Sequence, residues 1–291
     1  MSVLFSDDLP ADNESLRRRI FQGEIFLLPA GAASLCLCDA LLQIASDNIL
    51  GEKQTVTAGN RQVVAAALRA APGRSGEEGA RAGHAIVKEA LLAEPTFDEL
   101  LLAVLDECGF ERQEVLFDPL RMRISYDGGY KEEINRRSNS VHRDTWYANS
   151  QSQINFWMPL HDVSAADAFS FYLKNFASAV PNTSEQFDYD LWMKTTGWQS
   201  SMILSTFPTA DADPRSLGER TSFSARAGQL LLFSASHLHQ TNPNDSGLAR
   251  YSVDFRIVHR ADLASGLAAP NVDNLSQGDA TRDYRKNSDD V

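Results

Sequence analysis

The chain has 291 residues, of which 43% are hydrophobic and 23% are charged. This composition is typical of a globular protein and excludes a wholly disordered or fibrous chain. The formal net charge is −12. A surface of that sign repels polyanions, so we expect neither nucleic acid nor an anionic membrane as a main partner.

Targeting and cysteine patterns point to a soluble, cytoplasmic protein. The first residues, MSVLFSDDLPADNE, are acidic and lack the basic start and long apolar run of a secretory signal. No stretch approaches the ~18 uncharged apolar residues that a membrane-spanning helix needs. The three cysteines (Cys36, Cys38 and Cys108) are too few for a disulfide scaffold, so we expect reduced thiols that serve mainly in packing.

Helical patterns dominate the first 110 residues, with one short strand predicted at 24–29. A capping box at residues 96–99 begins the last of these helices, and Gly109 ends it. The helices are predicted at residues 16–20, 32–48, 62–71, 77–93 and 96–108.

Short alternating segments without helices between them follow from residue 111, which favours an antiparallel sandwich or barrel. Residues 1–262 are expected to form one domain, and the polar residues 263–291 a loosely packed tail. Two polar insertions, 131–140 and 182–198, could act as lids. The strands are predicted at residues 114–118, 121–126, 151–160, 169–173, 222–225, 229–235 and 250–258.

The most informative short motif is Val141-His142-Arg143-Asp144. Two residues apart on an extended segment, His142 and Asp144 lie on the same side and can hold two neighbouring positions on one metal ion. The alternative is that the two side chains only hydrogen-bond each other near a turn.

A second cluster follows about a hundred residues later. An apolar strand at 229–235 leads to His237 and His239, and Arg250 with Ser252 comes eleven residues after His239 on the next strand. Two imidazoles and one carboxylate on one face of a metal are typical of non-haem Fe(II) oxygenases and leave three positions open. A bidentate 2-oxoacid would need a cation for its far carboxylate, and a guanidinium with a nearby hydroxyl supplies one.

In this order, the motifs resemble those of the Fe(II)/2-oxoglutarate-dependent dioxygenases, and within them the phytanoyl-CoA hydroxylase-like branch. The resemblance covers residues 120–260. It implies an α+β protein with a double-stranded β-helix (jelly-roll, cupin-like) core and packed N-terminal helices. It also implies that His142, Asp144 and His239 ligate iron, and that Arg250 and Ser252 bind 2-oxoglutarate. His239 is preferred to His237 because Arg250 then falls at the family's usual offset.

Two features bear on the reaction. A carboxylate at Asp144 separates the chain from halogenating relatives, which have Gly or Ala there. The resemblance therefore implies that O2 and 2-oxoglutarate give succinate and CO2 as a substrate is oxidised. The segment 160–176 lacks the family's usual Pro-Gly-Ser-His loop, so the family's substrate specificity does not transfer.

Further residues near these motifs are weaker candidates. Their alternatives are ladder-edge polar groups, core aromatics, salt-bridge partners and solvated surface. The candidates are Asn155 and Arg123 for the cosubstrate, and Trp146, Gln153, Trp157 and Arg137 for the substrate.

Taken together, the sequence predicts an oxygenase that hydroxylates an unactivated C–H bond of a small polar metabolite, with desaturation and ring formation as alternative outcomes of the same oxidation. An amino acid, a sugar or a natural-product intermediate would qualify, either free or tethered to a carrier protein. Two alternatives stay open, namely a cupin-type metalloenzyme that does not use 2-oxoglutarate and a non-catalytic jelly roll that binds a small molecule.

Overall fold

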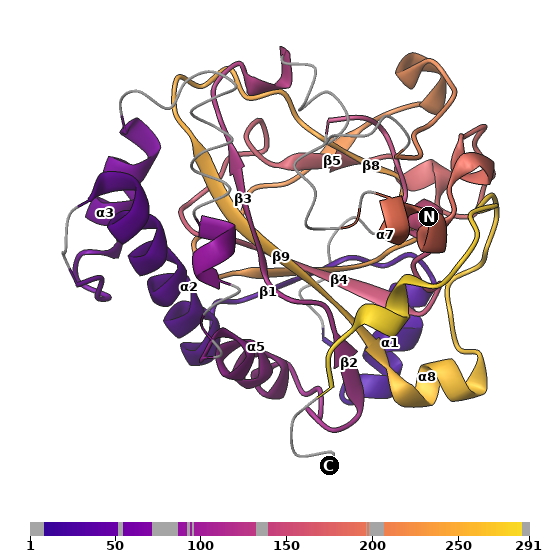
Figure 1. Ribbon diagram of the computed structural model, residues 1–291, viewed down its shortest axis with the longest axis horizontal. Helices are drawn as coiled ribbons and strands as arrows, with labels where there is room; N and C mark the ends of the chain where they lie inside the picture. The colour runs from indigo at the N-terminus through magenta and orange to yellow at the C-terminus, as the bar shows by residue number, and fades with distance from the viewer. Residues whose placement is uncertain are drawn as a thin grey trace.

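The computed structural model describes residues 9–51, 55–71, 87–91, 94, 96–131, 139–195, 197 and 207–286. Helices lie along one side of a large antiparallel sheet, and a smaller antiparallel sheet lies on the other side (Figure 1). The predicted helix at 77–93 falls mostly outside the described residues. Within it only residues 87–91 are described, and they are helical.

Four N-terminal helices are α1 (Asn13–Phe21), α2 (Ala32–Ala45), α3 (Arg61–Ala70) and α5 (Thr96–Glu107). Asp12 caps α1 by accepting a hydrogen bond from the Ser15 amide at 2.8 Å. The apolar face of α2 continues into a π-helical turn, η1 (Ser46–Leu50). Their buried side chains join those of α5 in the main hydrophobic core, so the predicted apolar face of 32–48 is confirmed.

The large sheet has the order β1-β7-β4-β9-β2, and β3 also pairs with β9. Every pairing in it is antiparallel. These strands are β1 (Phe26–Leu28), β2 (Val115–Phe117), β3 (Arg121–Ser125), β4 (Gln153–Pro159), β7 (Leu230–Ser234) and β9 (Arg250–His259).

The small sheet has the order β6-β5-β8, with β5 (Phe169–Phe171) between β6 (Thr221–Ser222) and β8 (His239–Thr241). Trp157 of β4 and Phe233 of β7 pack with Phe169 and Phe171 in one buried cluster. The two sheets therefore face each other across an aromatic layer.

Strand β9 separates two environments by its period of two. Val253 and Phe255 belong to the main core beside the helices, whereas Arg250, Ser252, Asp254 and Arg256 alternate with them and face the space between the sheets. The register pairs Asn155 of β4 with Arg256. Polar side chains of two adjacent strands are thus brought together inside the fold.

The C-terminal segment packs closely, so the expectation of a loose tail is wrong for the described residues up to 286. After α8 (Arg260–Ser265), Ala269 donates its backbone N–H to the Gln151 carbonyl at 3.1 Å. The chain then forms η7 (Ala280–Asp283) and runs beside β2 (Figure 1). There the backbone groups of Arg285 and Phe117 form an isolated antiparallel β-bridge. Composition misled the prediction because polar residues here make buried contacts.

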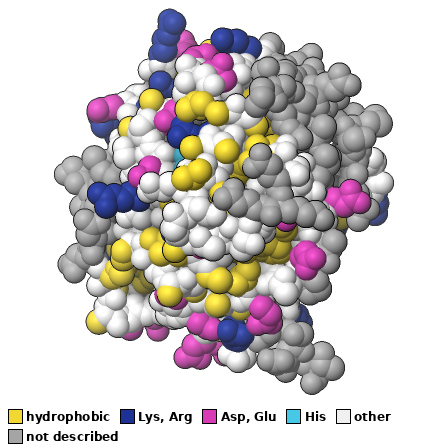
Figure 2. Space-filling model, turned by 90° about the vertical axis from the view of Figure 1, so that its left-hand side faces the viewer, with side chains coloured by type: hydrophobic (Ala, Val, Ile, Leu, Met, Phe, Trp, Pro, Cys, Tyr) yellow, Lys and Arg dark blue, Asp and Glu magenta, His cyan; other side chains and the backbone are white. Residues whose placement is uncertain are grey.

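Among the residues that the structure describes, one helical segment, Ala32–Leu50, is long and apolar enough by length and composition to cross a membrane, with a mean hydropathy of 1.3, which the sequence analysis did not expect. Its core-facing residues, such as Leu41 and Leu42, are fully buried against the rest of the fold. The outer face near α2 and α3 shows hydrophobic side chains scattered among charged ones (Figure 2).

The cysteines are free thiols, as expected. Burial raises the pKa of Cys38 and of Cys108 to about 12. Both are therefore protonated at neutral pH, which suits packing rather than nucleophilic chemistry.

Candidate metal centre

Two backbone segments carry the candidate ligands. His142 and His239 form an antiparallel bridge, with N–H to carbonyl distances of 3.0 and 2.9 Å. Asp144 begins a 3-10 turn, η3 (Asp144–Tyr147), instead of continuing the extended segment that the spacing suggested. The turn ends at Ala148, whose φ of 59° is the left-handed conformation.

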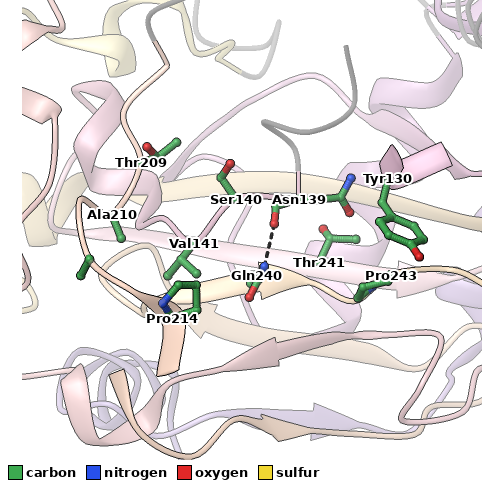
Figure 3. A pocket seen from close by; sticks show the side chains of 11 residues that line it. Tyr130, Asn139, Ser140, Val141, Thr209, Ala210, Pro214, Gln240, Thr241 and Pro243 are labelled. Atoms are coloured by element: carbon green, nitrogen blue, oxygen red, sulfur yellow. Dashed lines mark hydrogen bonds between the residues drawn. The ribbon is translucent and has the colours of Figure 1, made fainter. Parts of the chain in front are cut away.

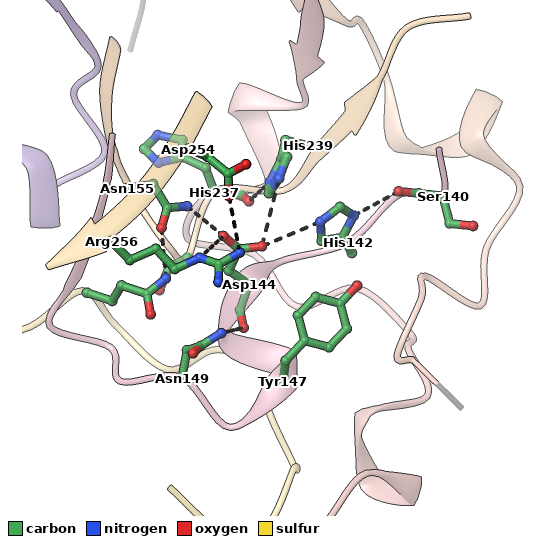
Figure 4. A network of polar contacts seen from close by, with 12 residues as sticks. Ser140, His142, Asp144, Tyr147, Asn149, Asn155, His237, His239, Asp254 and Arg256 are labelled. Atoms are coloured by element: carbon green, nitrogen blue, oxygen red, sulfur yellow. Dashed lines mark hydrogen bonds and ion pairs between the residues drawn. The ribbon is translucent and has the colours of Figure 1, made fainter. Parts of the chain in front are cut away.

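The three side chains converge. The Oδ1 atom of Asp144 lies 3.4 Å from His142 Nε2 and 4.0 Å from His239 Nε2. One potential ligand atom from each residue lies within 4.8 Å of the other two. Figure 4 shows both imidazoles on one side of the carboxylate and Asn155 and Arg256 on the other.

Backbone carbonyls determine which ring nitrogens are available. His142 Nδ1 lies 2.9 Å from the Ser140 carbonyl, and His239 Nδ1 lies 3.0 Å from the His237 carbonyl. Because a carbonyl only accepts, each Nδ1 carries the proton, and each Nε2 keeps its lone pair for a ligand. This second contact is typical of metal-binding histidines.

Charge at the centre is balanced around Asp144. Its Oδ2 atom accepts a hydrogen bond from Asn155 Nδ2 at 2.7 Å, which leaves Oδ1 toward the imidazoles. Burial opposes ionisation, but His142, the Arg256 guanidinium and His239 together hold the pKa of Asp144 well below its usual range. Burial, with a contribution from His142, lowers the pKa of His239 to about 4. At neutral pH the site therefore offers an anionic oxygen and an uncharged His239 nitrogen.

A hydrogen-bond relay supports the carboxylate from behind. The Tyr284 hydroxyl donates to Gln153 Oε1 at 2.5 Å, and Gln153 Nε2 donates to Asn155 Oδ1 at 2.7 Å. Asn155 then donates to Asp144. The structure thus engages Gln153 and Asn155, predicted to contact substrate and cosubstrate, in orienting Asp144.

Arg256 is a functional candidate that the sequence analysis did not identify. Its guanidinium lies 3.0 Å from Asp118, 3.7 Å from Asp254 and 3.8 Å from Asp144. Period-two spacing on the strand that carries Arg250 and Ser252 was the available signal, since Arg256 lies on the same face. Nothing in the sequence indicated that Asp118 or Tyr284 would join it.

Arg250 and Ser252 both lie inside the fold. Arg250 Nη1 donates to the carbonyls of Asp167 and Ala168 at 2.8 and 3.1 Å. The next residue, Phe169, has its ring centroid 5.9 Å from that of His239. The Arg250 guanidinium, on β9 of the large sheet, therefore reaches the start of β5 in the small sheet. Strand β5 is the neighbour of β8, which begins at His239.

Arg250 and Ser252 each have a buried polar atom without a hydrogen-bond partner among the described residues. These atoms are Arg250 Nε and Ser252 Oγ. Burial lowers the pKa of Arg250 to about 10, so the side chain stays cationic at neutral pH. A buried cation and hydroxyl with free donors are suited to an anionic ligand.

Arg123 and Trp157, two of the remaining predicted residues, make other contacts. Arg123 pairs with Asp254 at 2.5 Å, which matches the salt-bridge alternative. Trp157 packs edge-to-face with Phe169 and Phe223 in the aromatic layer. Arg137 falls outside the described residues.

Trp146 requires a correction, because it does not line the metal centre. Its indole is fully buried in a separate apolar cluster, and Nε1 donates to Asp273 Oδ1 at 2.8 Å. The 3-10 turn rotates it away, and Tyr147 takes the place beside His142, with ring centroids 5.5 Å apart.

His237 is also directed away from the centre. Its ring nitrogens lie 3.2 Å from the carbonyls of Ser234 and Gly23. Of the two late histidines, the structure brings only His239 together with His142 and Asp144 in the described residues.

A cavity of about 390 Å³ adjoins the strand pair that carries the histidines (Figure 3). Two of its lining residues are hydrogen-bonded to each other, because Gln240 Nε2 donates to the Asn139 carbonyl at 2.9 Å. Uncharged side chains line it: Tyr130, Asn139, Ser140, Val141, Thr209, Ala210, Ala212, Pro214, Gln240, Thr241 and Pro243.

Comparisons with known proteins give weak likenesses. No protein-family model matches the sequence, and no curated protein matches it. Among solved structures, EvdO2 from Micromonospora carbonacea var. aurantiaca complexed with 2-oxoglutarate is 14% identical, with a TM-score of 0.45, over 87% of this chain and 94% of that one.

Two other structures are similarly distant. The non-heme monooxygenase ThoJ in its apo form is 13% identical, with a TM-score of 0.42, over 84% of this chain and 77% of that one. The epimerase SnoN in complex with Fe3+, alpha ketoglutarate and nogalamycin RO is 14% identical, with a TM-score of 0.39, over 85% of each chain. Likenesses this low establish neither a family nor a function.

Proposed function

We propose that the chain is an Fe(II)- and 2-oxoglutarate-dependent oxygenase. The observation that carries this proposal is the convergence of His142 Nε2, His239 Nε2 and Asp144 Oδ1, with both Nδ1 atoms bound to backbone carbonyls. Two imidazoles and a carboxylate suit a non-haem Fe(II) centre with open positions. Iron held there would supply the redox chemistry that couples decarboxylation of 2-oxoglutarate to oxidation of a C–H bond.

The cosubstrate has a matching anchor. The buried Arg250 Nε and Ser252 Oγ lack partners in the described residues, and the far carboxylate of 2-oxoglutarate would accept hydrogen bonds from both. The aromatic layer between the sheets would exclude water, which strengthens these charge-assisted contacts. Asn155 and Arg256 hold Asp144 ionised and oriented.

The arrangement of the sheets supports the finer structural proposal. Two antiparallel sheets face each other with the candidate ligands at one end of the small sheet, as in a double-stranded β-helix. The phytanoyl-CoA hydroxylase-like branch, the single domain over residues 1–262 and the cytoplasmic location stay predictions.

We further propose a small polar substrate that is hydroxylated with release of succinate and CO2. The uncharged lining of the neighbouring cavity favours such a molecule, and the net charge of −12 opposes nucleic acid. The substrate could be free or tethered to a carrier protein.

A succinate-release screen against amino acids, sugars and biosynthetic intermediates tests the function. With Fe(II), ascorbate and 2-oxoglutarate, the wild type should form succinate with at least one candidate, and Asp144→Ala should form none. Arg250→Gln should raise the KM for 2-oxoglutarate by about tenfold or more because a charged hydrogen bond is lost. Arg226 is exposed, and Arg226→Gln serves as the matched control. Its KM for 2-oxoglutarate should be unchanged.

The alternatives give different results. A cupin-type metalloenzyme that does not use 2-oxoglutarate would turn over its substrate unchanged in Arg250→Gln. A non-catalytic jelly roll would release no succinate in any mixture. Either result contradicts the proposed reaction.

A further inference from the structure

A buried ion pair between Arg143 and Asp273 contacts both segments that carry the candidate ligands. Arg143, between His142 and Asp144 in the sequence, has a side chain that is 1% exposed, and its Nε donates to Asp273 Oδ2 at 3.1 Å. Asp273 belongs to the C-terminal segment, and its side chain is 5% exposed. A pair this deeply buried is stable only where its remaining hydrogen-bonding groups are satisfied.

Asp273 meets this condition with groups from separate parts of the chain. Besides Arg143, its carboxylate accepts from Trp146 Nε1 at 2.8 Å and from the Val180 amide at 3.0 Å. Arg143 and Trp146 flank Asp144, so one carboxylate holds the turn that carries this candidate ligand from both sides.

Arg143 extends the connection to the other ligand segment. Its Nη1 donates to the Ser236 carbonyl, and Nη2 donates to the carbonyls of Asn175 and Ser178 at 2.6 and 2.9 Å. Ser236 lies three residues before His239. The guanidinium therefore joins the turn of Asp144, the approach to His239 and the C-terminal segment.

We propose that Asp273 is a positioning residue that fixes the relative placement of the ligand-bearing segments, an inference that rests on the proposed metal centre. Asp273→Asn keeps the side-chain shape but replaces one acceptor oxygen with an amide donor. That amide cannot accept from Arg143, Trp146 and the Val180 amide together, and the buried guanidinium loses its counter-charge. The ligand segments then lose a shared anchor, although no ligand is removed.

The chain offers a matched control in Asp262, a second buried C-terminal aspartate. It pairs with Arg17 at 2.7 Å, with side-chain exposures of 6% for Arg17 and 2% for Asp262. Asp262→Asn breaks a comparable ion pair that contacts neither ligand segment. A purely structural role for Asp273 would make the two variants behave alike toward metal.

The experiment titrates Co(II) into the wild type and the variants, following the visible bands of the bound ion and checking folding by circular dichroism. Asp273→Asn should bind Co(II) about 10- to 100-fold more weakly than the wild type, with shifted bands. Asp262→Asn should melt at a lower temperature but keep the wild-type affinity and bands. Wild-type affinity and bands in folded Asp273→Asn would overturn the proposal, as would an equal loss of affinity in Asp262→Asn.

Two further variants separate other outcomes. If Asp273→Asn does not fold, Trp146→Phe removes one hydrogen bond to Asp273 and keeps an aromatic ring. A weaker Co(II) affinity in that variant supports the proposal, and an unchanged one overturns it. If the wild type binds no Co(II), or Asp144→Ala binds it as tightly, the proposed metal centre itself is wrong.

Discussion

At the residue scale, His142 and His239 divide their two ring nitrogens between the backbone and the centre. Each Nδ1 is held by a carbonyl within its own segment, which fixes both the tautomer and the ring orientation. Asp144 divides its oxygens in the same way, since Oδ2 is bound by Asn155. Nε2 of each histidine and Oδ1 of Asp144 therefore face one another at the centre, while the other ring nitrogens and Oδ2 bind the backbone and Asn155.

Tyr284→Phe tests the relay behind Asp144. The variant removes the hydroxyl that donates to Gln153 and lies three hydrogen bonds away from the Asp144 carboxylate. We expect Co(II) affinity to fall by about two- to tenfold, which is less than the roughly 10- to 100-fold loss typical of direct contacts to metal ligands, because the hydroxyl acts through Gln153 and Asn155. Isothermal titration calorimetry measures this fall.

The control is Tyr189→Phe, which removes a hydroxyl that donates to Asp283 at 2.5 Å, one residue before Tyr284. Its Co(II) affinity should equal that of the wild type. An equal affinity in Tyr284→Phe would show that the relay does not act on the centre.

The buried side chain of His161 should make the free energy of unfolding depend on pH. Its Nε2 accepts from the Tyr251 amide at 3.1 Å, and burial lowers the pKa of His161 from 6.5 to about 4. Between these values the unfolded chain binds a proton that the folded chain does not, so stability falls as the pH decreases. This contribution amounts to about 2 kcal/mol between pH 7 and pH 5.

Urea unfolding of the wild type and His161→Gln at both pH values measures the effect. Glutamine can still accept from Tyr251 but does not titrate. The variant should therefore lose about 2 kcal/mol less than the wild type on going from pH 7 to pH 5. An identical loss in both proteins would contradict the assignment.

At the element scale, β9 has two faces with different roles, and a pair of substitutions separates them. Phe255 is fully buried on the helix side and stacks on Phe156, with ring centroids 4.7 Å apart. Phe255→Ala should cost about 3–5 kcal/mol of unfolding free energy by leaving a cavity. It should leave the KM for 2-oxoglutarate unchanged in the folded protein.

Ser252→Ala should show the opposite pattern. The change removes a buried hydroxyl without a partner in the described residues, so stability should stay within about 0.5 kcal/mol or rise. The KM for 2-oxoglutarate should rise about tenfold, because the proposed hydrogen bond from Ser252 to the cosubstrate carboxylate would be lost. Chemical unfolding and steady-state kinetics on both variants check the pair, and a KM that rises only in Phe255→Ala would refute the division of faces.

At the scale of the whole molecule, patterns among residues close together in the sequence predicted structure correctly. Contacts between residues far apart in the sequence could not be predicted in this way. Alternation predicted β3, an apolar run predicted β7, and strand-like segments predicted β4 and β9. The H-x-D spacing, with the family resemblance that selected His239, named the three side chains that converge. The 3-10 turn at Asp144 was not predictable from an extended pattern, so Trp146 was misplaced.

The largest difference between the predicted and the observed structure lies in the C-terminal segment. Asp273 and Tyr284 lie in a stretch whose polar composition indicates solvent exposure, yet both make buried contacts with residues more than a hundred positions earlier. Period two would have found Arg256, but no local pattern encodes a partner so far away in the sequence.

The most direct test of the central claim is anaerobic binding of Fe(II) and 2-oxoglutarate, followed by the visible charge-transfer band of the bound pair. The wild type should show the band, His142→Ala should lack it, and Arg250→Gln should need more 2-oxoglutarate to reach it. No band in the wild type, or an equal band in His142→Ala, would contradict a single iron held by His142, Asp144 and His239.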